Sequence, residues 1–112
     1  MSTIDYATFE SVDLRSGTIV KVEDFAKAKK PAFKIWADFG NDIGILQTSA
    51  QVTVHYTKEE LVGRQIVGCV NLGEKNIAGF MSQFLLVGFA DDKGSICLIS
   101  VDPKVKNGKK LH

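Results

Sequence analysis

The residues that could do chemistry are few and widely spaced in this chain of 112 residues. Its two histidines are His55 and His112, and no glycine-bounded serine, phosphate-binding glycine loop or HExxH segment accompanies them. The usual sets of nucleophile, base and orienting group are therefore missing. Asp13 and Arg15 could form an acid–base pair, but charges two residues apart on a strand share one face and more often form an ion pair. We expect no enzyme activity, no catalytic residue and no cofactor.

The two cysteines, Cys69 and Cys97, each lie inside a short apolar run. They form no CxxC motif, and no histidine is near either of them in the sequence, although such spacing is what zinc sites and redox pairs usually show. Free cysteine is among the most frequently buried residue types. We therefore expect two small buried thiols, and we predict no metal site.

Side chains suited to binding gather in two stretches of alternating pattern. Between residues 32 and 39 every second residue is apolar, and Lys34 and Trp36 occupy the other face. Between residues 43 and 54 the corresponding face carries Gln47, Ser49 and Gln51. An indole beside an ammonium group, next to a row of amides and hydroxyls, can stack a base or hold a peptide. The alternatives are a tryptophan at the core edge or in a subunit contact, and a plainly solvated sheet face.

Phe80 and Met81 lie inside a Gly-x-x-Ser element that begins at Gly79 and ends at Ser82. At least one of the two should pack in the core. The other could leave apolar surface exposed, and such surface on a soluble chain usually marks an interaction site. Methionine and phenylalanine suit apolar partners of varied shape.

The charges are nearly balanced overall but unevenly distributed. The formal net charge of +1 is too small to indicate nucleic-acid binding by itself. Only acids, at positions 5, 10 and 13, precede the first basic residue, whereas residues 103–112 hold four lysines and no acid. Four more lysines stand at positions 27, 29, 30 and 34. The acidic start and the basic end could attract each other within one chain or across a two-fold dimer.

The elements that must position these residues are mostly strands. Alternation of apolar and polar residues predicts strands over residues 12–25, 32–39, 43–54, 64–72, 83–90 and 95–101. The first should bend or bulge at Gly17. A capping box from Thr57 to Glu60, ended by Gly63, predicts one short helix, and residues 91–94 predict a hairpin turn. This order indicates an all-β fold, a five-stranded Greek-key barrel of the OB type with one short helix after the third strand and short terminal extensions. A small sandwich is the structural alternative.

The length is that of one domain, and we expect a single domain over residues 1–112. No apolar run reaches the roughly 20 residues that a membrane span needs. The first residues lack the basic and apolar regions of a signal peptide. A cytoplasmic protein without membrane insertion is therefore expected.

From about residue 8 to residue 110 the chain resembles the free-standing tRNA-binding-domain proteins. Six sequence elements in order carry the resemblance, at residues 13–19, 30–35, 38–40, 60–64, 70–72 and 77–82. The nearer match is the CsaA branch, named as secretion-related chaperones, through residues 39–40, 43–45, 47–53 and 77–80. Proteins of this branch are small OB-fold homodimers whose terminal extensions pack at the subunit interface, and the resemblance implies the same arrangement here.

The resemblance also implies a tRNA site, carried over residue by residue onto Lys30, Lys34, Asn71, Lys75 and Ser82. RNA-binding relatives have a Gly-Met pair after this serine, where the present chain has Phe84 and Leu85. Loss of that glycine removes a close approach to the backbone, and the small net charge offers little phosphate neutralisation. Both departures favour polypeptide over RNA as the ligand.

The first hypothesis is a CsaA-like homodimeric chaperone, or binding module, for unfolded or export-bound polypeptides. Its surface would consist of Lys34, Trp36, Gln47, Ser49, Gln51, Phe80 and Met81. The alternative is a structure-specific tRNA-binding protein that uses the same face of the barrel. A third possibility is a dimeric scaffold in which these residues serve only packing.

Overall fold

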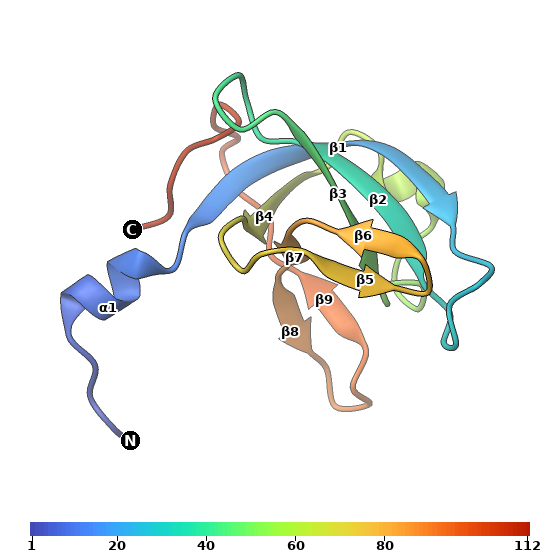
Figure 1. Cartoon of the computed structure of the whole chain (residues 1–112), viewed down its shortest axis with the longest axis horizontal. Coiled ribbons are helices and arrows are strands. Elements are labelled where there is room, and N and C mark those ends of the chain that lie inside the picture. Colours follow the sequence, from blue (N-terminus) through green and yellow to red (C-terminus); the bar gives the residue numbers. More distant parts are fainter.

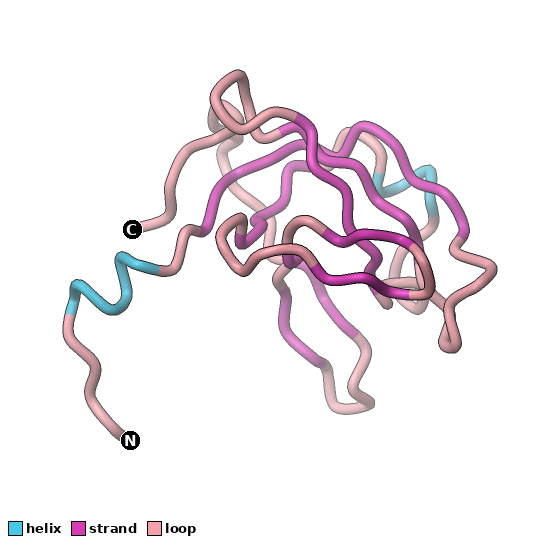
Figure 2. Tube along the Cα trace, viewed as in Figure 1, coloured by secondary structure: helices cyan, strands magenta, loops and turns pink.

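The computed structural model describes residues 1–112 as two short helices and nine strands (Figure 1). In chain order these are α1 Tyr6–Ser11, β1 Leu14–Asp24, β2 Phe33–Asp38, β3 Ile45–Ala50, α2 Lys58–Leu61, β4 Gln65–Cys69, β5 Lys75–Ile77, β6 Phe80–Ser82, β7 Leu85–Leu86, β8 Gly88–Ala90 and β9 Ile96–Leu98. Figure 2 shows how little of the chain is helical. The prediction of an all-β fold with a short helix after the third strand is confirmed. Neither helix has the length and apolar composition needed to cross a membrane.

Five strands form one antiparallel sheet in the order β3-β2-β1-β4-β7, and β5–β6 and β8–β9 form two hairpins. The sheet curls so that its two outer strands approach each other. The backbone N–H of Gln83 donates to the carbonyl of Gln47 at 2.8 Å, and the Thr48 hydroxyl donates to the carbonyl of Phe84 at 2.7 Å. These bonds nearly close the barrel between β3 and the residues before β7.

The core is built from the inward faces of these strands and from α2. The side chains of Ile35, Phe39, Leu61 and Ile66 are completely buried. Helix α2 has the predicted capping box, with the Thr57 hydroxyl accepting from the backbone N–H of Glu60 and the Glu60 carboxylate accepting in return from the backbone N–H of Thr57. This second bond holds the pKa of the Glu60 carboxyl below its usual value.

The first strand bulges at a different residue from the one predicted. The β1–β2 register shifts between Ile19 and Lys21, whereas Gly17 pairs regularly with Ile66 of β4. The reason for the glycine is packing, because a Cβ at position 17 would lie 2.7 Å from the ring of Phe39. The glycine thus lets an aromatic ring reach the strand backbone.

Several other predictions differ in detail from the structure. The strand expected over residues 83–90 is divided into β7 and β8, because Val87 donates to Val67 of β4 while β8 turns away to pair with β9. Between the strands expected over residues 64–72 and 83–90, where no element was predicted, lies the β5–β6 hairpin. Helix α1 was not predicted; its N-cap is Asp5.

The basic C-terminal segment pairs with the first strand of its own chain. Residues 105–111 run along the part of β1 that β2 leaves free, with the Ser16 N–H donating to the Lys109 carbonyl at 2.9 Å. The Lys110 ammonium donates to the backbone carbonyl of Glu10 at 2.7 Å. The two ends of the chain therefore meet within one subunit, through a carbonyl and not a carboxylate. The predicted Asp13–Arg15 ion pair is confirmed at 2.6 Å.

Candidate binding cavity

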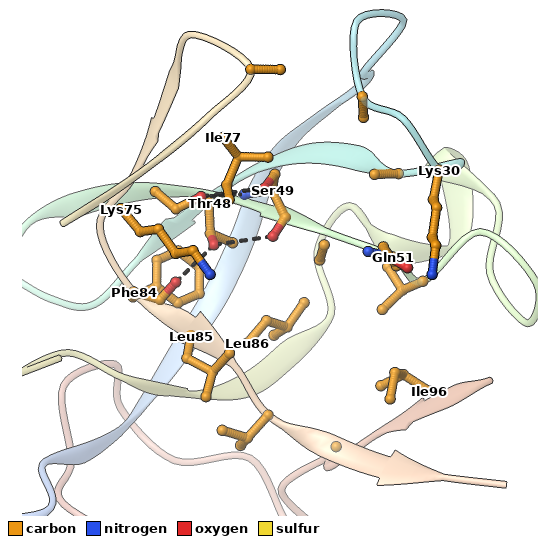
Figure 3. A pocket seen from close by; sticks show the side chains of 18 of the residues that line it. Lys30, Thr48, Ser49, Gln51, Lys75, Ile77, Phe84, Leu85, Leu86 and Ile96 are labelled. Carbon is orange, nitrogen blue, oxygen red and sulfur yellow. Dashed lines mark hydrogen bonds between the residues drawn. The ribbon is translucent and has the colours of Figure 1, made fainter. Parts of the chain in front are cut away.

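A cavity of about 1190 Å³ opens where β3, the β5–β6 hairpin and strands β7–β9 face one another (Figure 3). Its lining includes four lysines, Lys27, Lys29, Lys30 and Lys75, and no acidic residue. Apolar side chains make up much of the rest, among them Val52, Ile77, Leu85 and Ile96. We call this the lysine-lined cavity. Its shape and charge suit a ligand with apolar groups and negative charge.

Strand β3 supplies the polar wall of the cavity. The Ser49 N–H donates to the Ser82 hydroxyl at 3.0 Å, and the two hydroxyl groups are 3.3 Å apart. This pair holds the β5–β6 hairpin against β3. Gln51 follows the end of β3, and its backbone N–H and carbonyl form no hydrogen bond in the chain. Gln51 therefore lines the cavity with backbone groups that have no partner in the chain.

Figure 3 shows Lys30 and Lys75 on opposite sides of the cavity, with Leu85 and Leu86 between them. Lys30 comes from the loop between β1 and β2, and Lys75 from the start of β5. Leu85 is 52% exposed, whereas its neighbours Phe84 and Leu86 are 4% and 8% exposed. These two adjacent residues therefore have different roles: Phe84 fills the core, and Leu85 presents an apolar side chain to the cavity.

Trp36 and Phe80 contact each other instead of facing an open groove. Their ring centroids lie 5.8 Å apart, edge to face, and Phe80 also packs on Phe25 at 5.6 Å. The Lys34 ammonium lies 5.0 Å from the centroid of Phe80, and that of Lys21 lies 4.7 Å from the centroid of Trp36. This aromatic cluster fastens the hairpin over β2 through ring–ring and cation–π contacts. Lys34, Trp36 and Phe80 are absent from the cavity lining.

Gln47 also holds the hairpin in place. Its side-chain amide donates to the Met81 carbonyl at 2.9 Å and accepts from the Trp36 indole N–H at 3.3 Å. Its backbone N–H donates to the Gln83 side chain at 3.1 Å. Met81 is 38% exposed but does not line the cavity.

Asn71 does not line the cavity and instead fixes the start of β1. Its side chain accepts from the Asp13 N–H at 3.0 Å and donates to the Ser11 carbonyl at 2.7 Å. The fold brings together five residues of the two predicted sites, namely Lys30, Ser49, Gln51, Lys75 and Ser82. The cavity adds Lys27, Lys29, Leu85 and Ile96, which no predicted site included; the lysine run was visible in the sequence, but its position beside β7–β9 was not.

Residues 14–110 match the family described as "Putative tRNA binding domain". Crystal structures of chaperone CsaA from Bacillus anthracis strain Ames and from Picrophilus torridus superpose with TM-scores of 0.92 and 0.91, at 37% and 38% identity. They cover 99% and 98% of this chain and 100% of their own chains. A MetRS-related protein from Pyrococcus horikoshii superposes with a TM-score of 0.88 at 28% identity, over 100% of both chains. The predicted OB-type barrel is thereby confirmed.

Curated relatives include methionine–tRNA ligases of Methanocaldococcus jannaschii and Pyrococcus furiosus, which are 32% and 35% identical over 112 residues. The match covers 100% of this chain but only 17% and 15% of those ligases. The chain therefore spans a small part of the length of these relatives.

Proposed function

The chain belongs to the tRNA-binding-domain family and is of the CsaA type, and from that premise we propose that it is a homodimeric chaperone for unfolded or pre-secretory polypeptides. The observation that carries this proposal is the lysine-lined cavity, whose apolar wall and unpartnered Gln51 backbone suit an extended chain. The binding module would occupy residues 1–112, act in the cytoplasm and need neither catalytic residue nor cofactor.

In this proposal the client lies along the end of β3. Its backbone pairs with the free N–H and carbonyl of Gln51, while its apolar side chains contact Leu85, Ile77 and Ile96. The lysines attract carboxylates that flank the apolar segment. Lys34, Trp36, Gln47, Phe80 and Met81 act indirectly, because they position the hairpin that forms one wall.

Homodimer formation is supported by the apolar surface near the N-terminus. Helix α1 has only six residues and buries none of them, and a helix this short has little stability of its own. Ile4 and Tyr6 are each 63% exposed, and Val12 is 43% exposed. A second subunit covering this surface would stabilise α1. Two cavities in one dimer would raise the avidity for a long client.

The test is saturable binding of a fluorescent, permanently unfolded polypeptide, measured by anisotropy. Replacing Leu85 with Ser should weaken binding about tenfold or more, since one buried aliphatic side chain contributes about 1.5–3 kcal/mol. Val62 is a matched control, because it is 50% exposed and lies outside the cavity, and Val62→Ser should bind normally. Absence of binding at micromolar dimer, or equal affinities of the two variants, would rule the proposal out.

The second candidate is structure-specific tRNA binding, and the four cavity lysines without an acid favour it. A gel-shift assay with bulk tRNA at two salt concentrations tests this function, because phosphate contacts make affinity fall steeply with salt. The double variant Lys30→Ala, Lys75→Ala should lose affinity and show a shallower salt dependence, whereas Lys106→Ala should change neither. No shift at low salt removes this candidate.

A further inference from the structure

Three side chains that can ligate a metal ion meet where the β8–β9 hairpin faces the segment between β3 and α2. They are His55, Asp91 and Cys97, and their donor atoms all lie within 4.8 Å of one another. None of the three lines the lysine-lined cavity. We propose that this His–Asp–Cys cluster is a binding site for a zinc ion, separate from the surface assigned to polypeptide or RNA.

The identity of the donors selects the metal. One imidazole nitrogen, one thiolate sulfur and one carboxylate oxygen are the ligand types that Zn²⁺ takes in proteins. Mg²⁺ and Ca²⁺ prefer oxygen ligands alone and would gain little from Cys97 or His55. Three protein ligands also leave the fourth tetrahedral position to a water molecule, as in zinc sites that are open to solvent.

The distances require only a small adjustment. Zinc bonds of about 2.0–2.3 Å place tetrahedral donors about 3.3–3.8 Å apart. His55 Nε2 and Asp91 Oδ2 are 2.7 Å apart, so an ion would enter where these two atoms now share a proton. The His55 and Asp91 side chains are 38% and 31% exposed, which leaves them room to move by the ångström or so that Cys97 Sγ needs.

The backbone around the cluster is already fixed. The Oδ1 atom of Asp91 accepts from the N–H groups of Lys93 and Ser95, each at 2.9 Å, which orients Oδ2 toward His55. Tyr56 and Leu98 directly follow the other two ligands, His55 and Cys97, in the sequence. The N–H of Leu98 donates to the Tyr56 hydroxyl at 2.8 Å and so joins the two backbone segments. Ligands held by such outer contacts bind a metal more tightly than free side chains do.

This site was not visible in the sequence, where no histidine lies near either cysteine. Even the two residues of the ion pair, His55 and Asp91, are 36 positions apart in the sequence. Only the folding of the hairpin beside the segment after β3 brings a thiol to the imidazole. Cys97 is therefore not simply a buried thiol: it is partly exposed, whereas Cys69 is 2% exposed.

Co²⁺ alone is a suitable first probe, because a cobalt–thiolate bond gives a charge-transfer band in the near ultraviolet and tetrahedral cobalt gives visible bands. We expect one equivalent of Co²⁺ to produce both, and Zn²⁺ to displace it. Cys97→Ser should abolish the charge-transfer band, and His55→Gln should weaken Zn²⁺ binding at least about 100-fold, the upper end of what loss of an outer contact costs.

The chain provides matched controls, since it contains one other cysteine and one other histidine. Cys69→Ser and His112→Gln should keep the full cobalt spectrum and the Zn²⁺ affinity of the unchanged protein. Circular dichroism confirms that each variant is folded. Absence of a charge-transfer band, or a band that survives Cys97→Ser and is lost in Cys69→Ser, would overturn the site. Neither outcome depends on whether polypeptide or tRNA is bound.

Discussion

At the scale of single residues, the barrel depends on two rings and the glycines beside them. Phe39 and Phe84 meet edge to face with centroids 4.9 Å apart. A Cβ at Gly68 would lie 2.7 Å from Phe39 and 2.8 Å from Phe84, so only glycine leaves room for both rings. Phe84 is therefore a core residue of this chain, with a packing role that is independent of the ligand.

Adjacent positions 84 and 85 should consequently respond in opposite ways to mutation. Phe84→Ala should lower the free energy of unfolding by about 3–5 kcal/mol, because it removes a buried ring and leaves a cavity. Leu85→Ala should change it by only about 0.5 kcal/mol, because the side chain is half exposed. Denaturant unfolding measures both. Equal destabilisation would contradict the assignment of Phe84 to the core and Leu85 to the cavity.

At the scale of elements, the β5–β6 hairpin has an unusual turn. Ala78 and Gly79 both have positive φ, of 49° and 85°, as in the two-residue turns that suit hairpins. Asn-Gly is the pair that this turn prefers, and alanine in the left-handed region costs about 1–2 kcal/mol. The hairpin keeps its shape because Trp36 and Gln47 hold it from outside.

Replacing Ala78 with Asn should therefore stabilise the protein by about 1 kcal/mol, since asparagine tolerates the left-handed conformation. Thermal unfolding should show a higher midpoint for this variant. Ala26→Asn, at an exposed position without positive φ, provides the comparison and should bring no gain. A lower midpoint for the Ala78 variant would mean that outside contacts, and not the turn, determine this conformation.

These elements also show how far the sequence could predict the structure. Helix α2 and the strands were predictable because their signals are local: a capping box within four residues and a period of two. The β5–β6 hairpin was not predictable, because Ala-Gly is a weak turn signal. The hairpin is stabilised by contacts with β2 and β3, which are distant in sequence. The cavity and the His–Asp–Cys cluster join segments distant in sequence, so only single lysines, Ser49, Gln51 and Ser82 could be identified beforehand.

At the scale of the whole molecule, the exposed apolar surface of α1 is the place where we propose that a second subunit binds. Truncating the basic C-terminal segment would be a poor test of the dimer, because residues 105–111 also hold β1 of their own chain. A substitution on α1 avoids this problem. Tyr6 opens the helix, where an acidic residue is compatible with the helix dipole.

Tyr6→Asp should raise the dimer dissociation constant about tenfold or more, because an exposed aromatic ring in each subunit would lose its apolar contact. Sedimentation equilibrium over a range of concentrations measures the monomer fraction. Val62→Asp, also exposed but far from α1 in the sequence, should leave it unchanged. A protein that is monomeric before any substitution, or a dimer indifferent to Tyr6→Asp, would argue against the α1 interface.

The in–out alternation at β7 has a practical consequence for redesign. Leu85 faces the cavity between two residues committed to the core. Ligand preference could therefore be changed in a small library at this position with little loss of fold. Larger side chains would shrink the cavity, and a glutamate would lower its positive charge. A cavity whose selectivity varies at one position while its scaffold stays constant is one from which new specificities can evolve by single steps.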